Sequence, residues 1–126
     1  MARVGVLPGE KSLYWTGSSK SDLVRFPEMV RHEIGVALSV AQFGGKHPDS
    51  KPWKGQGTGV YELVSDFRSS TYRAVYTVRF KRAVYVLHAF QKKSPSGMKT
   101  ARGDVKLVAQ RLRMAQEDYQ VRYGKD

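Results

Sequence analysis

The sequence contains no cysteine. This absence excludes disulfides, thiolate-bound metals and cysteine nucleophiles, and it fits a reducing compartment. The sequence also lacks an apolar stretch of signal-peptide type near its first residue and any hydrophobic run long enough to span a membrane. We therefore expect a cytoplasmic protein that makes no membrane contact.

Acidic residues are scarce. The chain has 11 Asp and Glu against 22 Lys and Arg, which gives a formal net charge of +11. The basic residues are spread along the chain, and because 40% of the residues are hydrophobic we expect a folded domain rather than a disordered basic arm. Such a surface favours nucleic acid, the ribosome or an acidic protein as a partner over a membrane surface.

The length predicts a single domain over residues 1–126, in which residues 1–10 lack periodicity and are expected to be flexible. Residues 11–16 predict a short edge strand and residues 18–26 a short helix. A second helix is predicted from Pro27, because proline suits a first helical turn, to the glycine pair at 44–45. Its apolar residues recur at helical spacing: Val30, Ile34, Ala37, Leu38 and Ala41.

Strands and a last helix are predicted in the second half. Residues 46–59 are rich in proline and glycine and predict a loop, followed by strands over 60–67 and on both sides of a turn within 71–93. After a loop at 94–103, with Thr100 as a candidate cap, one apolar helical face is expected: Val105, Val108, Leu112, Ala115 and Tyr119. The fold class is α+β, with two N-terminal helices, an antiparallel sheet made of a three-stranded meander and an N-terminal edge strand, and a C-terminal helix.

The strand register follows if residues 81–82 form a two-residue turn, because Arg73 then lies opposite Phe90. A four-residue turn at 68–71 would pair Asp66 with Arg73. One face of the hairpin is then expected to be core, with Tyr76, Val78, Tyr85 and Leu87. The other face would carry Arg73, Thr77, His88 and Lys92, either as a solvated surface or as a cationic site.

Metal and cofactor chemistry is not predicted. The three histidines fall on a helix, in a loop and on a strand, and none has a partner at ligand spacing. Gly55, Gly57 and Gly59 precede a strand instead of following one into a helix, so they do not form a phosphate-binding loop. No serine lies in a recognisable nucleophile elbow.

A cationic sheet face with one histidine suits metal-independent RNA cleavage. That reaction needs a base for a ribose 2′-OH, cations for the phosphorane and an acid for the departing 5′-oxygen. Arg73 with Lys92 or Lys93 would supply the cations, and His88 the acid or base, because its ordinary pKa lies near neutrality. Glu62 is a second candidate base; the alternative for His88 is a half-buried residue satisfied by a hydrogen bond.

Basic and aromatic residues interleave in the loop before the first meander strand. Trp53 is a candidate for stacking on a base while neighbouring lysines meet phosphates, although a tryptophan that closes the core is the commoner case. The candidate contacts to RNA or the ribosome are Lys46, Lys51, Trp53, Lys54 and Arg68.

The succession KPWKG, VYEL, TYRAVYTV and VYVLHAFQKKS, followed by a basic helix, resembles the RelE/ParE toxin superfamily and its HigB-type, phage-derived branch over roughly residues 13–119. The resemblance implies a type II toxin that enters the ribosomal A site and cuts mRNA. It also implies a cognate antitoxin, expected to carry a helix-turn-helix domain, that holds the toxin inactive in a hetero-oligomer.

Residue by residue, the resemblance matches Arg73 to the arginine that contacts the scissile phosphate, and Lys92 and Lys93 to the cationic position after the last strand. Lys51 and Lys54 match the basic residues that lead into the first meander strand. RelE has a catalytic lysine where Glu62 stands in this sequence, which leaves the identity of the base open. A ParE-like gyrase inhibitor and a non-catalytic RNA-binding phage accessory protein remain alternatives.

Overall fold

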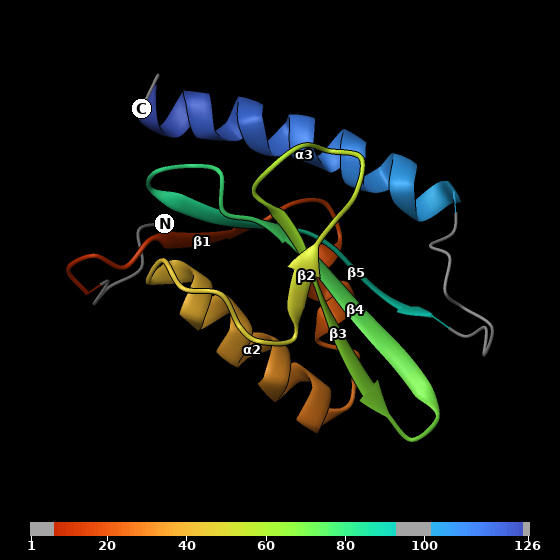
Figure 1. The fold of residues 1–126 in the computed structure, drawn as a ribbon. Coiled ribbons are helices and arrows are strands. Elements are labelled where there is room, and N and C mark those ends of the chain that lie inside the picture. The colour runs from red at the N-terminus through yellow and green to blue at the C-terminus, as the bar shows by residue number, and fades with distance from the viewer. Residues whose placement is uncertain (1–6, 93–101, 125–126) are drawn as a thin grey trace.

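The computed structural model describes residues 7–92 and 102–124, which form the predicted α+β fold. Five strands make one mixed sheet in the order β1-β5-β4-β3-β2, with β1 parallel to β5 and the other pairs antiparallel (Figure 1). The elements are β1 (Ser12–Trp15), α1 (Ser19–Leu23), α2 (Glu28–Gln42), β2 (Ser50–Pro52), β3 (Val60–Phe67), β4 (Ser70–Thr77), β5 (Ala83–Lys92) and α3 (Arg102–Tyr123).

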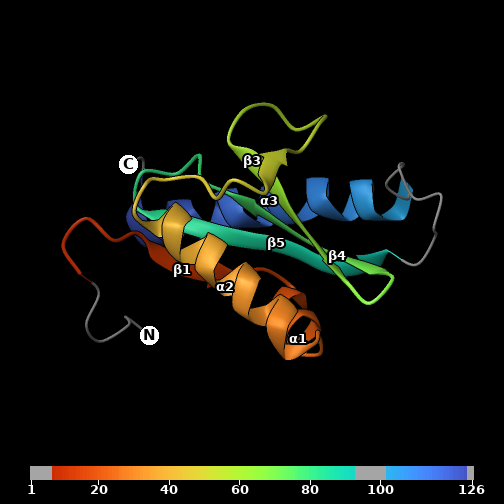
Figure 2. The same ribbon diagram turned by 60° about the horizontal axis from the view of Figure 1, so that its bottom comes forward.

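Helices cover both faces of the sheet. Helices α1 and α2 lie on one side and α3 lies on the other, as the turned view shows (Figure 2). Each side has its own apolar cluster, one including Ile34 and Tyr76 and the other including Leu112 and Tyr85. The prediction of one core face and one charged face is therefore wrong, since the charged residues share their face with a second core.

The N-terminal elements follow the sequence prediction. Strand β1 is an edge strand, as expected, but it runs parallel to β5, whereas an antiparallel sheet was predicted. Helix α2 begins directly after Pro27. Helix α2 ends before Gly44, whose φ of 87° is a left-handed conformation that glycine adopts without steric cost. The apolar residues predicted for its inner face are buried.

The predicted loop at 46–59 contains strand β2, which the sequence analysis missed. β2 is only three residues long, includes Pro52, and pairs with the edge of β3 so that Lys51 lies opposite Glu62. So short a segment shows no measurable alternation of apolar and polar residues, which is why the sequence did not indicate a strand. Proline is tolerated in a strand at the sheet edge. The consequence is that Lys51 belongs to the sheet.

The turn between β3 and β4 has two residues, not four. Arg68 and Ser69 both have positive φ, 50° and 68°, as a type I′ hairpin requires. Neither is the glycine or asparagine usual at those positions, which is why the sequence did not indicate this turn. The register places Val64 opposite Arg73, so the predicted pairing of Asp66 with Arg73 is wrong.

The connection between β4 and β5 spans residues 78–82 and is followed by a β-bulge. On β4, Val75 pairs with His88 and Tyr76 pairs with Val86. Leu87 therefore has no partner on β4. Arg73 still lies opposite Phe90, as predicted, because the bulge restores the register. Between the β4–β5 connection and the bulge, the observed pairing is shifted by one residue from the predicted pairing. Tyr76 and Val78 therefore lie on the α2 side of the sheet, whereas Tyr85 and Leu87 lie on the α3 side.

Helix α3 packs on the sheet through the predicted apolar face, except that Val105 is 37% exposed. Arg111, on the same helix, is buried and donates hydrogen bonds to the Leu87 carbonyl (3.0 Å) and to Ser18 Oγ (3.0 Å). Burial lowers its pKa. Thr100 lies outside the described residues, and no helix among the described residues is long and apolar enough to cross a membrane.

Candidate functional site

Ionisable side chains from four strands gather on the sheet face that α3 covers. Strand pairing puts Lys51 opposite Glu62 and His88 in the same row across the sheet, with Arg73 in the next row. Lys92, opposite Thr71, follows at the end of β5. Because side chains alternate between faces along a strand, all of these residues lie on one face. The ionic cluster, as we call it, comprises Lys51, Glu62, Arg73, His88, Lys92 and, from the first turn of α3, Asp104.

Arg73 forms a buried ion pair with Glu62. The Arg73 Nη1 group donates to Glu62 Oε1 over 2.5 Å, and each side chain is 10% exposed. A buried guanidinium needs such a partner, because an unpaired charge is expensive to remove from water. Arg73 Nε is also buried and has no hydrogen-bond partner in the described part of the chain, so a donor remains for an anionic ligand.

His88 is held from two sides. Its Nε2 lies 2.7 Å from Asp104 Oδ1, and its ring stacks on Phe90 with 4.5 Å between ring centroids and 20° between planes. The His88 side chain is 8% exposed. Its other nitrogen, Nδ1, is buried and has no hydrogen-bond partner among the described residues, so it is the ring nitrogen that keeps an unused hydrogen-bonding position.

Lys92 places an ammonium group beside this arrangement. Its Nζ atom is buried without a hydrogen-bond partner in residues 7–92 and 102–124. Burial and, next, the charge of Arg73 lower the pKa of Lys92, while Glu62 and Asp104 oppose this shift. An anion bound here would restore the lost solvation of the ammonium and relieve its repulsion by Arg73.

The other predicted RNA contacts are not all near the ionic cluster. Lys54 is exposed just after β2. Lys46 donates to the Ser50 carbonyl (2.9 Å) and lies 5.8 Å from the ring centroid of Tyr61, which packs on the α2 side. Arg68 lies over Phe67, also on that side. Lys93 lies outside the described residues.

Trp53 is part of the core. It is 4% exposed and packs in the apolar cluster beneath α3, with Val60 and Val75. Its ring therefore offers no open face for stacking on a base, and the alternative weighed from the sequence, a tryptophan that closes the core, is what the structure shows.

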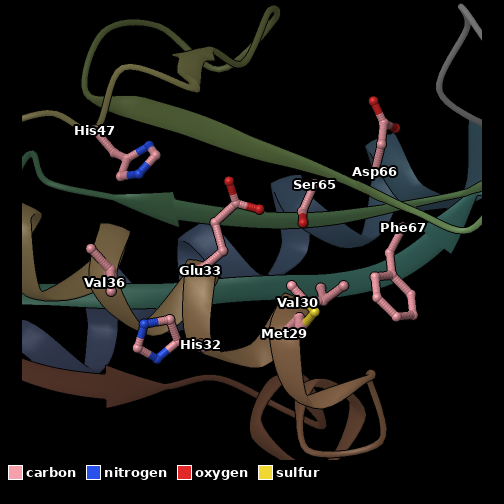
Figure 3. A pocket seen from close by; sticks show the side chains of 9 residues that line it. All are labelled: Met29, Val30, His32, Glu33, Val36, His47, Ser65, Asp66 and Phe67. Carbon is pink, nitrogen blue, oxygen red and sulfur yellow. The ribbon is translucent and has the colours of Figure 1, made fainter.

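Two further histidines, His32 and His47, line a pocket on the opposite side of the sheet from the ionic cluster (Figure 3). It lies between α2 and β3 and is lined by Met29, Val30, His32, Glu33, Val36, His47, Ser65, Asp66 and Phe67. The fold brings Glu33, His47 and Asp49 together, with candidate ligand atoms within 4.8 Å of one another, although the sequence showed no such spacing. His47 Nδ1 already accepts a hydrogen bond from the Asp49 amide (3.1 Å), and we assign no metal role to the group.

Asp104 is the member of the ionic cluster that the sequence analysis missed. An acidic residue in the first turn of a helix is ordinary, because the helix dipole favours negative charge there. Its contact with His88 crosses from α3 to β5, and no spacing rule links the two residues. Chemically, the cluster combines three cations that can hold a phosphate with an imidazole and two carboxylates, the types of group that can move protons.

Comparisons with known proteins show what the chain is similar to. A family model described as "Phage derived protein Gp49-like" matches residues 21–113. Among solved structures, a mutant of the E. coli toxin RelE in the free state is 21% identical, with 64% of this chain and 81% of that chain covered and a TM-score of 0.49.

A chain of the toxin–antitoxin complex RelBE2 from Mycobacterium tuberculosis is 20% identical, with 68% of this chain and 94% of that chain covered and a TM-score of 0.38. A comparison with curated proteins found no match. The segment matched by the family model includes all the residues of the ionic cluster.

Proposed function

The chain belongs to the Gp49-like family of phage-derived proteins, and from this membership we propose that it is the toxin of a type II toxin–antitoxin system that cleaves mRNA on the ribosome. The membership confirms the phage-derived relationship expected from the sequence, whereas the HigB-type branch stays a prediction. The observation that carries the proposal is the convergence of Arg73, His88 and Lys92 on one sheet face, with buried polar atoms that have no partner among the described residues.

The proposed reaction is an internal displacement at phosphorus. A base takes the proton of a ribose 2′-OH, the 2′-oxygen bonds to the adjacent phosphorus, and the bond to the 5′-oxygen breaks. An acid gives a proton to that oxygen, so the products are a 2′,3′-cyclic phosphate and a 5′-hydroxyl. The reaction consumes no water, oxidant or cofactor.

The cations of the cluster would stabilise the phosphorane. Arg73 and Lys92 donate to its non-bridging oxygens, and Lys51 adds positive charge at the edge of the sheet, with Lys93 and Lys54 as further proposed contacts. These fixed side chains supply the positive charge that a metal ion supplies in other nucleases, so the proposed mechanism is metal-independent.

His88 is the proposed group for proton transfer, and Glu62 is the alternative base. Glu62 already accepts a hydrogen bond from Arg73, and this buried ion pair occupies one of its carboxylate oxygens. His88 keeps one ring nitrogen without a partner among the described residues and can therefore take up or release a proton there. This difference favours His88.

The proposed partners follow from charge. A net charge of +11 favours rapid association with the ribosome, with mRNA and with an acidic surface of a cognate antitoxin. The antitoxin, expected to carry a helix-turn-helix domain, would hold the toxin in a hetero-oligomer in the cytoplasm.

Primer extension on a defined mRNA in a purified translation system tests this function. The wild-type chain, Arg73→Ala and the exposed-residue control Arg31→Ala are each added with ribosomes present or omitted. Cuts that need ribosomes and disappear only with Arg73→Ala support the proposal. An absence of cuts under every condition would favour a gyrase inhibitor or a non-catalytic RNA-binding protein.

A further inference from the structure

We propose that Asp104 is a positioning residue that fixes His88 so that its Nδ1 atom is the one that exchanges a proton with RNA. The inference rests on the proposed function, since it names the atom and the support for its proton-transfer step. It starts from the 2.7 Å contact between His88 Nε2 and Asp104 Oδ1.

The contact determines which nitrogen is free. An ionised carboxylate can only accept hydrogen bonds, so the Nε2 atom of His88 must carry its proton and donate to Asp104. In the neutral ring the lone pair then lies on Nδ1, and in the charged ring Nδ1 holds the proton that can be given away. Whichever proton transfer of the cleavage His88 performs, the proton therefore passes through Nδ1.

The surroundings of His88 support this assignment. Nδ1 is a buried polar atom with no partner in the described part of the chain, an arrangement that costs free energy unless a ligand supplies a hydrogen bond. Phe90 stacks on the ring and limits its rotation. Because Nδ1 is covered, the side chains around the ring must move when RNA binds.

Asp104 is placed by the docking of α3 on β5. Further along the same helix, Arg111 donates to the Leu87 carbonyl (3.0 Å) and Asp118 accepts a hydrogen bond from Tyr85 (2.5 Å). Three polar contacts therefore align α3 with β5, and only the one through Asp104 reaches the ionic cluster. The position of the helix is thereby coupled to the orientation of the imidazole.

A purely structural role for Asp104 makes a different prediction. If its contact only fastened α3 to the sheet, loss of the Asp118 contact with Tyr85 should affect cleavage to a similar degree. Asp118→Asn is therefore the matched control, because it removes a carboxylate contact between the same two elements outside the cluster.

The experiment combines kinetics with NMR spectroscopy. Single-turnover cleavage and ribosome binding are measured for the wild-type chain, Asp104→Asn, Asp104→Glu and Asp118→Asn, with thermal unfolding to confirm folding. Asp104→Asn should cleave about 10- to 100-fold more slowly at nearly unchanged ribosome affinity, since it weakens general acid–base catalysis. Asp104→Glu should recover part of the rate, and Asp118→Asn should retain it.

In the NMR spectrum of the free chain, a low-field proton attached to His88 Nε2 is expected. It is assigned by its loss in His88→Gln, and it should persist in Asp118→Asn but disappear in Asp104→Ala. Absence of this proton in the wild-type chain, or equal cleavage rates for Asp104→Asn and Asp118→Asn, would overturn the proposal.

The proposed function and the role of Asp104 can fail separately. If the wild-type chain cuts no RNA, the proposed function fails and the catalytic part of this inference fails with it. The low-field proton would still report whether Asp104 holds His88. If the chain cuts RNA but Asp104→Asn cuts as fast, only the inference on Asp104 fails.

Discussion

Arg73 and Glu62 form a buried ion pair although they are not directly opposite each other in the sheet. Val64 faces Arg73 in the ladder between β3 and β4, and the guanidinium reaches diagonally to Glu62 on the same face. The pair leaves Arg73 Nε without a partner among the described residues. The proposed contact of Arg73 with a phosphate therefore does not require it to give up its contact with Glu62.

We predict that Glu62→Gln destabilises the fold by about 1–3 kcal/mol, because glutamine keeps an acceptor but leaves the buried guanidinium without a countercharge. Urea unfolding at neutral pH measures the change. Glu117→Gln, at an exposed position of α3, is the control and should unfold like the wild-type chain. Equal stability of both variants would show that the ion pair contributes nothing.

Arg73→Ala should lower the cleavage rate about 100- to 1,000-fold, the effect expected when one donor to the developing negative charge is removed. Arg73→Lys should recover only part of the rate, because an ammonium lacks the planar fork of a guanidinium. Single-turnover cleavage on ribosomes is the measurement. Full activity of Arg73→Ala would remove this residue from the mechanism.

The lowered pKa of Lys92 predicts a pH effect on stability. Burial, followed by repulsion from Arg73, lowers this pKa from its ordinary value of 10.5 in the folded chain. Between the lowered pKa and the ordinary value, the unfolded chain binds more protons at this site than the folded chain, so this site makes stability increase with pH.

Urea unfolding of the wild-type chain and Lys92→Met from about pH 7 to about pH 10 measures this effect. At neutral pH Lys92→Met should be the more stable of the two, and its advantage should shrink as the pH rises. Lys106→Met, at an exposed position of α3, should show no such trend. A constant difference between wild type and Lys92→Met would contradict the assignment.

Trp53 is predicted to act through stability and not through RNA contact. Trp53→Ala should cost about 3–5 kcal/mol, as expected for loss of a large buried aromatic side chain. Lys54→Ala, one residue further along, should leave stability unchanged and weaken ribosome binding. Chemical denaturation and ribosome-binding assays distinguish the two, and a stable Trp53→Ala variant with weak RNA binding would reverse the assignment.

The sequence predicted the elements that have a long, regular pattern. Helix α2 and strand β3 were found with nearly their observed bounds, because periodic apolar residues and flanking proline or glycine define them locally. Arg73, His88 and Lys92 were expected on one face and lie on one face. That expectation succeeded because the bulge at Leu87 compensates for the longer connection between β4 and β5.

The remaining features depend on tertiary contacts. A bulge, a two-residue turn with positive φ at Arg68 and Ser69, and a three-residue edge strand have no distinct local pattern. The contact of His88 with Asp104 depends on where α3 docks, which packing against β5 decides. For the same reason the burial of Arg111 has no local signal in the sequence.

The most direct test of the central claim is cleavage of an mRNA that carries a single 2′-deoxynucleotide on the 5′ side of the scissile phosphate, placed in the ribosomal A site. The account predicts rapid cleavage of the all-ribose message, with 2′,3′-cyclic phosphate and 5′-hydroxyl ends, and no cleavage of the 2′-deoxy message at that position. Equal cleavage of both messages would contradict attack by the 2′-oxygen and with it the mechanism assigned to the ionic cluster.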